Sequence, residues 1–210
     1  MKSISEKSQF SFKGLGAALT NILLALTFLV FAYAHVQHFL ETPRLSLLLI
    51  IAVEGLIAVM LLIRSDPDQT AHNWKTWLTT FGGTFAPLLL RPTEVPTDLL
   101  IGQGVQLVGF VLQLAGVMSL NRSFGLLPAH RGVKSDGLYR FVRHPLYSTY
   151  ALAHIGYLIN NFSVYNTAII IFTTAFQVAR ILNEERLLMN YPDYVNYTGR
   201  TRWRLIPAVW

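Results

Sequence analysis

Long apolar runs limit what this chain can fold into more than any other feature of the sequence. Several are long enough to cross about 30 Å of hydrocarbon as a helix of about 20 residues. Of the 210 residues, 52% are hydrophobic and 13% are charged, whereas about 25% of the residues of soluble domains are charged. The sequence therefore predicts an all-α integral membrane protein with about six transmembrane segments. We expect them at residues 14–38, 45–63, 76–90, 98–120, 146–160 and 164–183.

The third, fifth and sixth segments have special features. The segment 76–90 is short and contains Gly82, Gly83 and Pro87, which favours a shortened or broken helix. The fifth and sixth segments are separated by the sequence NNFSV, residues 160–164. A connection this short predicts a tight helical hairpin.

The basic residues predict an orientation, because Lys and Arg accumulate in cytoplasmic loops. With a cytoplasmic amino terminus, only Arg44 and Arg91 of the 17 basic residues fall on the outer side. The 121–145 loop and the 184–210 tail then share the cytoplasmic face with both termini, and we expect a multi-pass protein of a bacterial inner membrane. The cytoplasmic basic residues are Lys2, Lys7, Lys13, Arg64, Lys75, Arg122, Arg131, Lys134, Arg140, Arg143, Arg180, Arg186, Arg200, Arg202 and Arg204.

Composition also excludes several classes of function. The net charge is +6, but apolar runs separate the basic residues, so they form no single face for a nucleic acid. The absence of cysteine excludes disulfides and thiolate chemistry. The sequence AYA at 32–34 resembles a signal cleavage site. The apolar region before it is longer than a signal core of about 7–15 residues, so we expect the segment to remain.

The stretch YRFVRHPLYSTY, residues 139–150, concentrates cationic and aromatic side chains just before an apolar segment. Proline is favoured in the first turn of a helix, so a helix is predicted to begin at Pro145. The start of a helix attracts anions, and Arg140 and Arg143 stand beside it. An anion site is one interpretation. The other is that both arginines are ordinary cytoplasmic residues that contact lipid phosphate.

Two further groups of polar residues invite a functional interpretation. Glu184 and Glu185 follow the last apolar segment, where they could bind a cation such as an ammonium group or form a solvated helix end. Glu54 lies within the second apolar run, where a carboxylate is by default a functional candidate, either protonated or paired with His35. His35 and His38 are compatible with a metal, but no carboxylate motif completes a set, and we predict no metal site.

Several motifs occur together in the carboxyl-terminal part of the chain. In order they are Gly-Leu-Tyr at 137–139, Arg-His-Pro-Leu-Tyr at 143–147, Glu-Glu-Arg-Leu-Leu at 184–188, Tyr-Val-Asn-Tyr at 194–197 and Ile-Pro at 206–207. This series, from about residue 121 to 207, resembles the isoprenylcysteine carboxyl methyltransferase family and its relatives among the membrane phospholipid methyltransferases. There is no GxGxxG, P-loop or HExxH motif, so a nucleotide-type cofactor would not be held by a Rossmann domain.

The resemblance implies S-adenosylmethionine as cofactor, in a cytoplasmic pocket formed by the 121–145 loop, the start of the fifth segment and the tail. Residues 121–210 would form the methyltransferase core, and residues 1–120 the entrance for the acceptor. An arginine at the helix start would suit the cofactor carboxylate, and Glu184 its ammonium group. The cofactor-binding residues implied are Tyr139, Arg140, Arg143, His144, Pro145, Leu146, Tyr147, Glu184 and Glu185.

The acceptor implied is a hydrophobic or prenylated small molecule or a lipid, and an isoprenylcysteine-type carboxylate is favoured. A carboxylate needs only a cation such as Arg180 or Arg200 to position it. An amine or thiol must lose a proton, which makes His144 or Glu185 candidate bases. Two alternatives remain open: a membrane reductase that uses NADPH in a similar pocket, and a membrane carrier without enzymatic activity.

Overall fold

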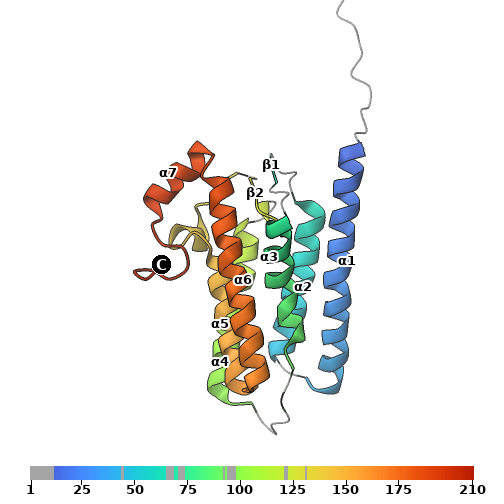
Figure 1. Cartoon of the computed structure of the whole chain (residues 1–210). Helices are drawn as coiled ribbons and strands as arrows, with labels where there is room; N and C mark the ends of the chain where they lie inside the picture. The colour runs from blue at the N-terminus through green and yellow to red at the C-terminus, as the bar shows by residue number, and fades with distance from the viewer. Residues whose placement is uncertain are drawn as a thin grey trace, which may run out of the picture.

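The computed structural model shows a bundle of long helices, with a short helix and the carboxyl-terminal tail at one end (Figure 1). Its described residues are 12–43, 45–64, 69–70, 74–91, 93, 98–120, 123–130 and 132–210, without the side chains of 12–17, 45–47, 69–70 and 88. Lys2, Lys7, Arg44, Arg122 and Arg131, which entered the orientation prediction, lie outside these residues.

The described part of the chain is mainly α-helical, as predicted. The helices are α1 Phe12–Glu41, α2 Leu45–Ile63, α3 Trp74–Phe85, α4 Leu100–Leu120, α5 Pro145–Asn160, α6 Val164–Leu188 and α7 Pro192–Arg200. Two 3-10 turns, η1 Ala86–Leu89 and η3 Gly137–Arg140, accompany them. Two short strands, β1 Gln69–Thr70 and β2 Ala129–His130, pair antiparallel with Gln69 opposite His130.

Among the described residues, three helices are long and apolar enough to cross a membrane: Ala18–Glu41, Leu100–Leu120 and Val164–Leu188. A shorter apolar helix covers Leu48–Ile63. The membrane character is thus confirmed, while a count of six crossings stays a prediction. The break in the third segment is confirmed, because α3 ends at Phe85 and continues as a 3-10 turn that contains Pro87.

Glycines bring the helices of two pairs close together. A Cβ atom on Gly156 of α5 would lie 2.4 Å from the backbone nitrogen of Gln106 on α4, and one on Gly109 would lie 2.7 Å from that of Ala153. On the other side, Gly82 of α3 faces the ring of Phe176 on α6, 2.4 Å from the position of its missing Cβ. Small residues at these crossings allow close backbone approach, as is common between membrane helices.

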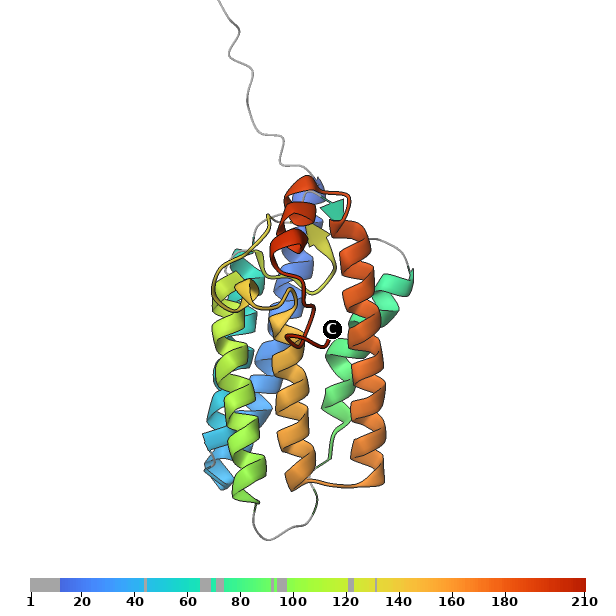
Figure 2. The same ribbon diagram turned by 90° about the vertical axis from the view of Figure 1, so that its left-hand side faces the viewer.

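The predicted hairpin has a short connection, but its two helices pack mainly against other partners. Helix α5 lies along α4, and α6 lies along α3 (Figure 2). The connection is held by asparagines: Asn160 Oδ1 accepts from Leu99 N at 2.9 Å, and Asn161 Oδ1 from Thr93 N at 3.1 Å. The separation of α5 from α6 leaves space for a cavity in the bundle.

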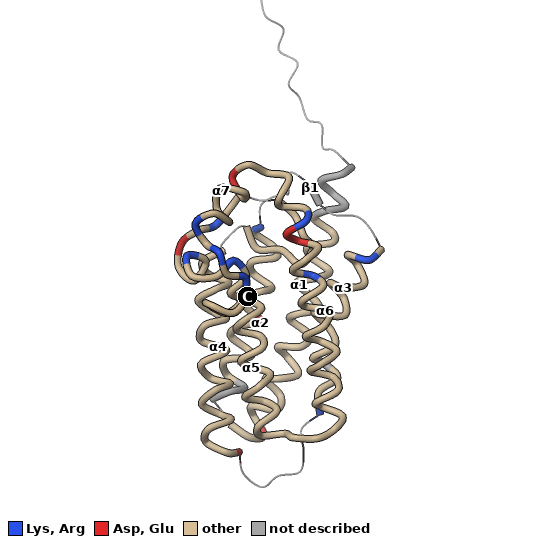
Figure 3. Tube along the Cα trace, turned by 60° about the vertical axis from the view of Figure 1, so that its left-hand side comes forward, with Lys and Arg blue, Asp and Glu red and all other residues tan. Residues whose placement is uncertain are grey.

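Charged residues gather at one end of the bundle. Lys and Arg residues surround α7 and the carboxyl terminus, and few charges occur along the helices toward the other end (Figure 3). Membrane proteins carry such basic clusters on their cytoplasmic side. The 123–142 loop and the tail that follows α6 both lie at this end (Figure 2).

Candidate active site

Helix α5 begins at Pro145, as the sequence predicted. His144 is the residue before the first turn, and its backbone φ and ψ of −128° and 58° lie outside the helical region, as expected before a proline. The 3-10 turn η3 precedes it and starts at Gly137, whose φ of +59° favours glycine. A side chain there would also meet Ser119 Oγ of α4 at 2.7 Å.

Glu184 and Glu185 point in different directions because adjacent residues on a helix are rotated by about 100°. Glu185 is 5% exposed and turns toward the carboxyl-terminal tail. Glu184 is only partly buried and accepts a hydrogen bond from the Tyr147 hydroxyl at 3.2 Å. The two carboxylates therefore have different surroundings and different partners.

Glu185 binds three basic side chains. Its Oε1 accepts from Arg143 Nε at 2.8 Å and lies 3.4 Å from His144 Nε2. Its Oε2 accepts from Arg204 Nε at 2.6 Å. A buried carboxylate is stable only with such partners, so Glu185 connects the end of α6, the start of α5 and the tail.

The tail also binds the two residues that precede α5. The backbone N–H groups of Arg143 and His144 donate to the carbonyls of Trp203 and Arg204 at 2.8 and 2.9 Å. Arg143 Nη1 donates to the carbonyls of Thr201 and Arg202 at 3.3 and 3.2 Å. Carbonyl oxygens of the tail thus take up several donors of Arg143 and His144 just before the helix.

A cavity of about 820 Å³ lies beneath this end and extends along the bundle between α5 and α6. Its volume is within the range of small-molecule sites. The predicted site residues that line it are Tyr139, Arg143, His144, Leu146, Tyr147, Arg180 and Glu184.

Four predicted site residues do not line this cavity: Arg140, Pro145, Glu185 and Arg200. Arg140 is exposed, with its guanidinium 4.4 Å from the ring centroid of Phe141. Arg200 is the last residue of α7. Neither residue therefore lines the cavity that most of the predicted site residues share.

Arg180 is the cation that enters the cavity from α6. Its guanidinium lies 5.5 Å from the ring centroid of Tyr147, and Nη1 donates to Thr84 Oγ1 at 3.3 Å. Nη2 donates to the carbonyl of Leu126. The buried Nε has no hydrogen-bond partner among the described residues. One N–H of this buried cation thus has no acceptor among the described residues.

Tyrosines lie at the end of the cavity near α7. The Tyr197 hydroxyl of α7 donates to the Tyr139 carbonyl of η3 at 2.5 Å. Burial raises the pKa of Tyr197 to about 12, so this donor keeps its proton at neutral pH. Burial, with a smaller effect of the nearby Glu184, also raises the pKa of Tyr139 well above its usual value. Both rings can pack on a ligand as neutral groups.

His130 lies at the same end of the cavity, although the sequence did not identify it as a site residue. It lines the cavity, stacks on Tyr191 with ring centroids 3.8 Å apart, and lies 3.0 Å from Asp193 Oδ2. This contact joins the 123–142 loop to the start of α7. Nothing in the sequence near His130 indicated it, because its partners are about 60 residues away.

The other end of the cavity contains the polar residues of the first two helices. His35 Nδ1 lies 2.9 Å from Glu54 Oε2, so the pairing considered for Glu54 is the one found. His38 lines the same part of the cavity. Among the described residues, no group of three or more histidine, aspartate or glutamate side chains could hold a metal ion.

Comparison with known proteins concerns the central and carboxyl-terminal part of the chain. Residues 99–190 match the model of the Isoprenylcysteine carboxyl methyltransferase (ICMT) family. No curated protein matches the chain. The matched region contains α4, the start of α5 with its Arg-His-Pro sequence, and the Glu184–Glu185 pair, and it ends before α7. The match agrees with the family that the motifs predicted, and it covers residues 99–190 of the 210.

Proposed function

We propose that this protein is an S-adenosylmethionine-dependent membrane methyltransferase that acts on an amphipathic or lipid-like acceptor. The observation that carries the proposal is that Glu184 and Arg180, one turn apart on α6, both line the cavity within the region that matches the family. One offers a carboxylate, the other an unpaired N–H. The zwitterionic end of the cofactor and an acidic acceptor need such groups.

The residues around the cavity fit this cofactor. Glu184 carries a carboxylate on the cavity wall for an ammonium group. Tyr139, Leu146 and Tyr147 are each at most 8% exposed and supply aromatic and apolar surface for the adenine. When bound, S-adenosylmethionine supplies a methyl group activated by the positive charge of its sulfur.

The role of Arg143, His144 and Glu185 is then to hold the carboxyl-terminal tail against the start of α5, rather than to bind a charged group of a ligand. Arg143 neutralises Glu185 and holds the tail through two carbonyls. Both carboxylate oxygens of Glu185 are bound by basic side chains, so we assign to it the positioning of the tail and not the role of a base. Arg140 and Arg200 have no proposed contact with either reactant.

The acceptor favoured by this arrangement is a carboxylate of the isoprenylcysteine type. The unpaired Nε of Arg180 would orient it, and no general base is needed because a carboxylate is already deprotonated at neutral pH. The remaining acceleration comes from alignment of the reactants and from exclusion of water in a largely apolar cavity. The end of the bundle with α7 would face the cytoplasm, and the shorter helices α2, α3 and α5 would complete six crossings.

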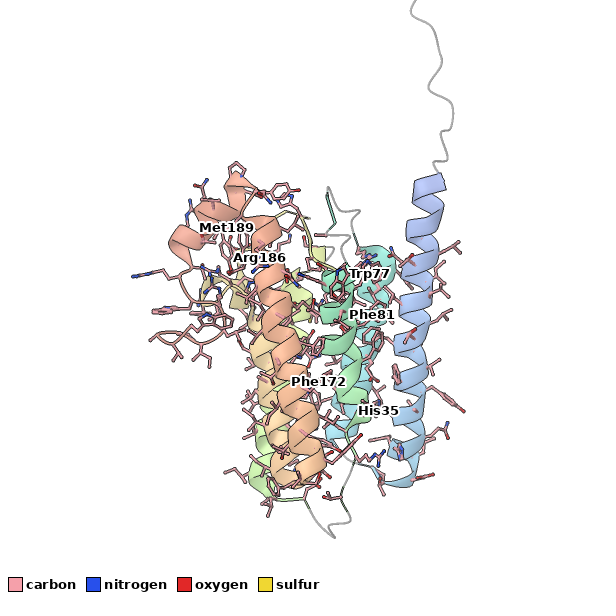
Figure 4. All side chains as sticks on the ribbon, in the orientation of Figure 1. His35, Trp77, Phe81, Phe172, Arg186 and Met189 are labelled. Atoms are coloured by element: carbon pink, nitrogen blue, oxygen red, sulfur yellow. The ribbon has the colours of Figure 1, made fainter. Side chains whose placement is uncertain are left out.

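Isothermal titration calorimetry of the detergent-solubilised protein with S-adenosylhomocysteine tests the proposal. Binding is expected in the wild type, and Glu184→Gln should weaken it. Arg186→Ala is the matched control, because Arg186 is exposed on the same turn of α6 (Figure 4). A response to NADPH with none to S-adenosylhomocysteine would instead support a reductase. Binding of neither S-adenosylhomocysteine nor NADPH would support a membrane carrier without enzymatic activity.

A further inference from the structure

The end of the cavity away from the family motifs contains a second polar site. His35 lies in the part of the bundle away from α7, whereas Arg186 and Met189 lie close to α7 (Figure 4). His35 and Glu54 line the cavity, with 27% and 13% of their side chains exposed. Their contact joins α1 to α2 at 2.9 Å.

The contact between His35 and Glu54 uses only one of the two hydrogen-bonding atoms of each side chain. The contact uses Nδ1 of His35 and Oε2 of Glu54. Within the described part of the chain, neither Nε2 of His35 nor Oε1 of Glu54 has a hydrogen-bond partner. A carboxylate oxygen at this depth of an apolar bundle is costly without a hydrogen bond. The pair therefore presents one vacant nitrogen and one vacant oxygen.

The middle of the largely apolar cavity also contains a few polar groups. Gln106 and Gln113 of α4 line it although both are buried. His154 of α5 lines it too, and its buried Nδ1 has no partner among the described residues. His154 is seven residues, or about 10 Å of helix, beyond Tyr147. A purely hydrocarbon chain would cover these groups without bonding them, which costs free energy.

We propose that the acceptor carries a hydroxyl group remote from its methyl-accepting group, and that Glu54, held in place by His35, binds this hydroxyl. A hydroxyl can donate to Oε1 of Glu54 while His35 Nδ1 holds Oε2 of the same carboxylate. An ammonium group fits less well, because it would compete with His35 for the same carboxylate. This assignment of the acceptor class rests on the proposed methyltransferase function, since that function places the reacting group at the Arg180 end.

Matched pairs of acceptor analogues test the inference by binding alone. The probes are N-acetyl-S-alkylcysteines of increasing chain length, each ending either in a methyl or in a hydroxyl group. Isothermal titration calorimetry is performed on the full chain in detergent, saturated with S-adenosylhomocysteine where it binds. For the chain length that reaches the pair, the hydroxyl analogue is expected to bind about tenfold tighter than its methyl partner, the effect of one hydrogen bond to a charged group.

The variants separate a binding site from a structural contact. Glu54→Leu and His35→Ala should each remove the preference for the hydroxyl analogue. His38→Ala should retain it, because it removes an imidazole from the same cavity and helix but leaves the Glu54 pair intact. If Glu54→Leu fails to fold, Glu54→Gln is measured in its place. It keeps a hydrogen-bonding oxygen, so it is expected to retain only part of the preference.

Two results would overturn the inference: equal affinity for both members of every pair in the wild type, or a hydroxyl preference that stays undiminished in both His35→Ala and Glu54→Gln. Failure of the proposed function is read separately, from the absence of S-adenosylhomocysteine binding and of methyl transfer to any probe. A hydroxyl preference in that case would still support a hydroxyl site at His35 and Glu54.

Discussion

The two ends of the cavity differ in how far the protein satisfies its own polar groups. At the end near α7, Glu185 has three basic partners, and the start of α5 is bonded to the tail. At the other end, His35 and Glu54 share a single contact. Motif residues near α7 thus mainly build a wall, and few of their polar atoms remain for a ligand. A polar residue of a family motif need not touch the reactants.

The largest expected effect comes from removing the contacts of Glu185 with Arg143, His144 and Arg204. Glu185→Ala leaves the buried Arg143 without its carboxylate and releases Arg204, so we expect a loss of about 3 kcal/mol in the free energy of unfolding. Thermal unfolding in detergent measures it, and limited proteolysis should cleave the tail after residue 200. Glu184→Ala is the control, and a tail equally protected in Glu185→Ala would contradict the role of Glu185.

A second large effect is expected between the two ends, where α5 packs on α4. Gly156→Ala places a Cβ 2.4 Å from the backbone nitrogen of Gln106, so the helices must move apart. Overpacking of this kind costs about 1–3 kcal/mol, which thermal unfolding would detect. Gly104→Ala in α4 is the matched control, because a Cβ there meets nothing within 4 Å. Equal stability of both variants would contradict the close contact.

The next effect separates the two adjacent glutamates. Glu184→Gln removes the negative charge from the cavity wall but leaves the tail contacts unchanged. We expect about a tenfold loss of affinity for S-adenosylhomocysteine, as for one charge-assisted hydrogen bond, with little change in the unfolding temperature. Glu185→Gln should show the reverse order of effects. Identical behaviour of the two variants would remove the distinction between them.

A smaller effect concerns the tyrosine cover and its pH dependence. The Tyr197 pKa rises from its usual 10 to about 12 in the folded protein, so the folded state retains a proton that the unfolded state loses. The free energy of unfolding is therefore expected to decrease as the pH rises from about 10 to about 12. Tyr197→Phe should reduce this slope and cost about 1 kcal/mol at neutral pH, because Tyr139 O loses its donor. Unfolding curves at several pH values measure both.

The smallest effect tests whether the two ends act independently. Glu54→Gln should change the affinity for S-adenosylhomocysteine less than about twofold, because well-separated sites without shared partners are usually additive. Calorimetry provides the measurement. A large change would mean that the two ends are coupled through the bundle, and the comparison between them would need revision.

Sequence reasoning predicted the elements near the motifs well. The start of α5 at Pro145, the break after Phe85 and the pairing of His35 with Glu54 depend on local rules for proline, glycine and charges in apolar segments. The side-chain directions were harder to predict. Glu184 and Glu185 looked alike in the sequence, yet the tail binds one and the cavity contains the other.

The sequence by itself determined the helical membrane character, the gathering of basic residues at one end and the match of residues 99–190 to a family model. These follow from hydropathy, charge order and motif order, which are properties of the chain alone. Only the tertiary structure decided that α5 pairs with α4 and α6 with α3, and that the tail binds Arg143 and His144 just before α5. The physical reason is that helix pairing depends on complementary surfaces. The partner of a backbone N–H group before α5 depends on which carbonyl, distant in the sequence, the fold brings next to it.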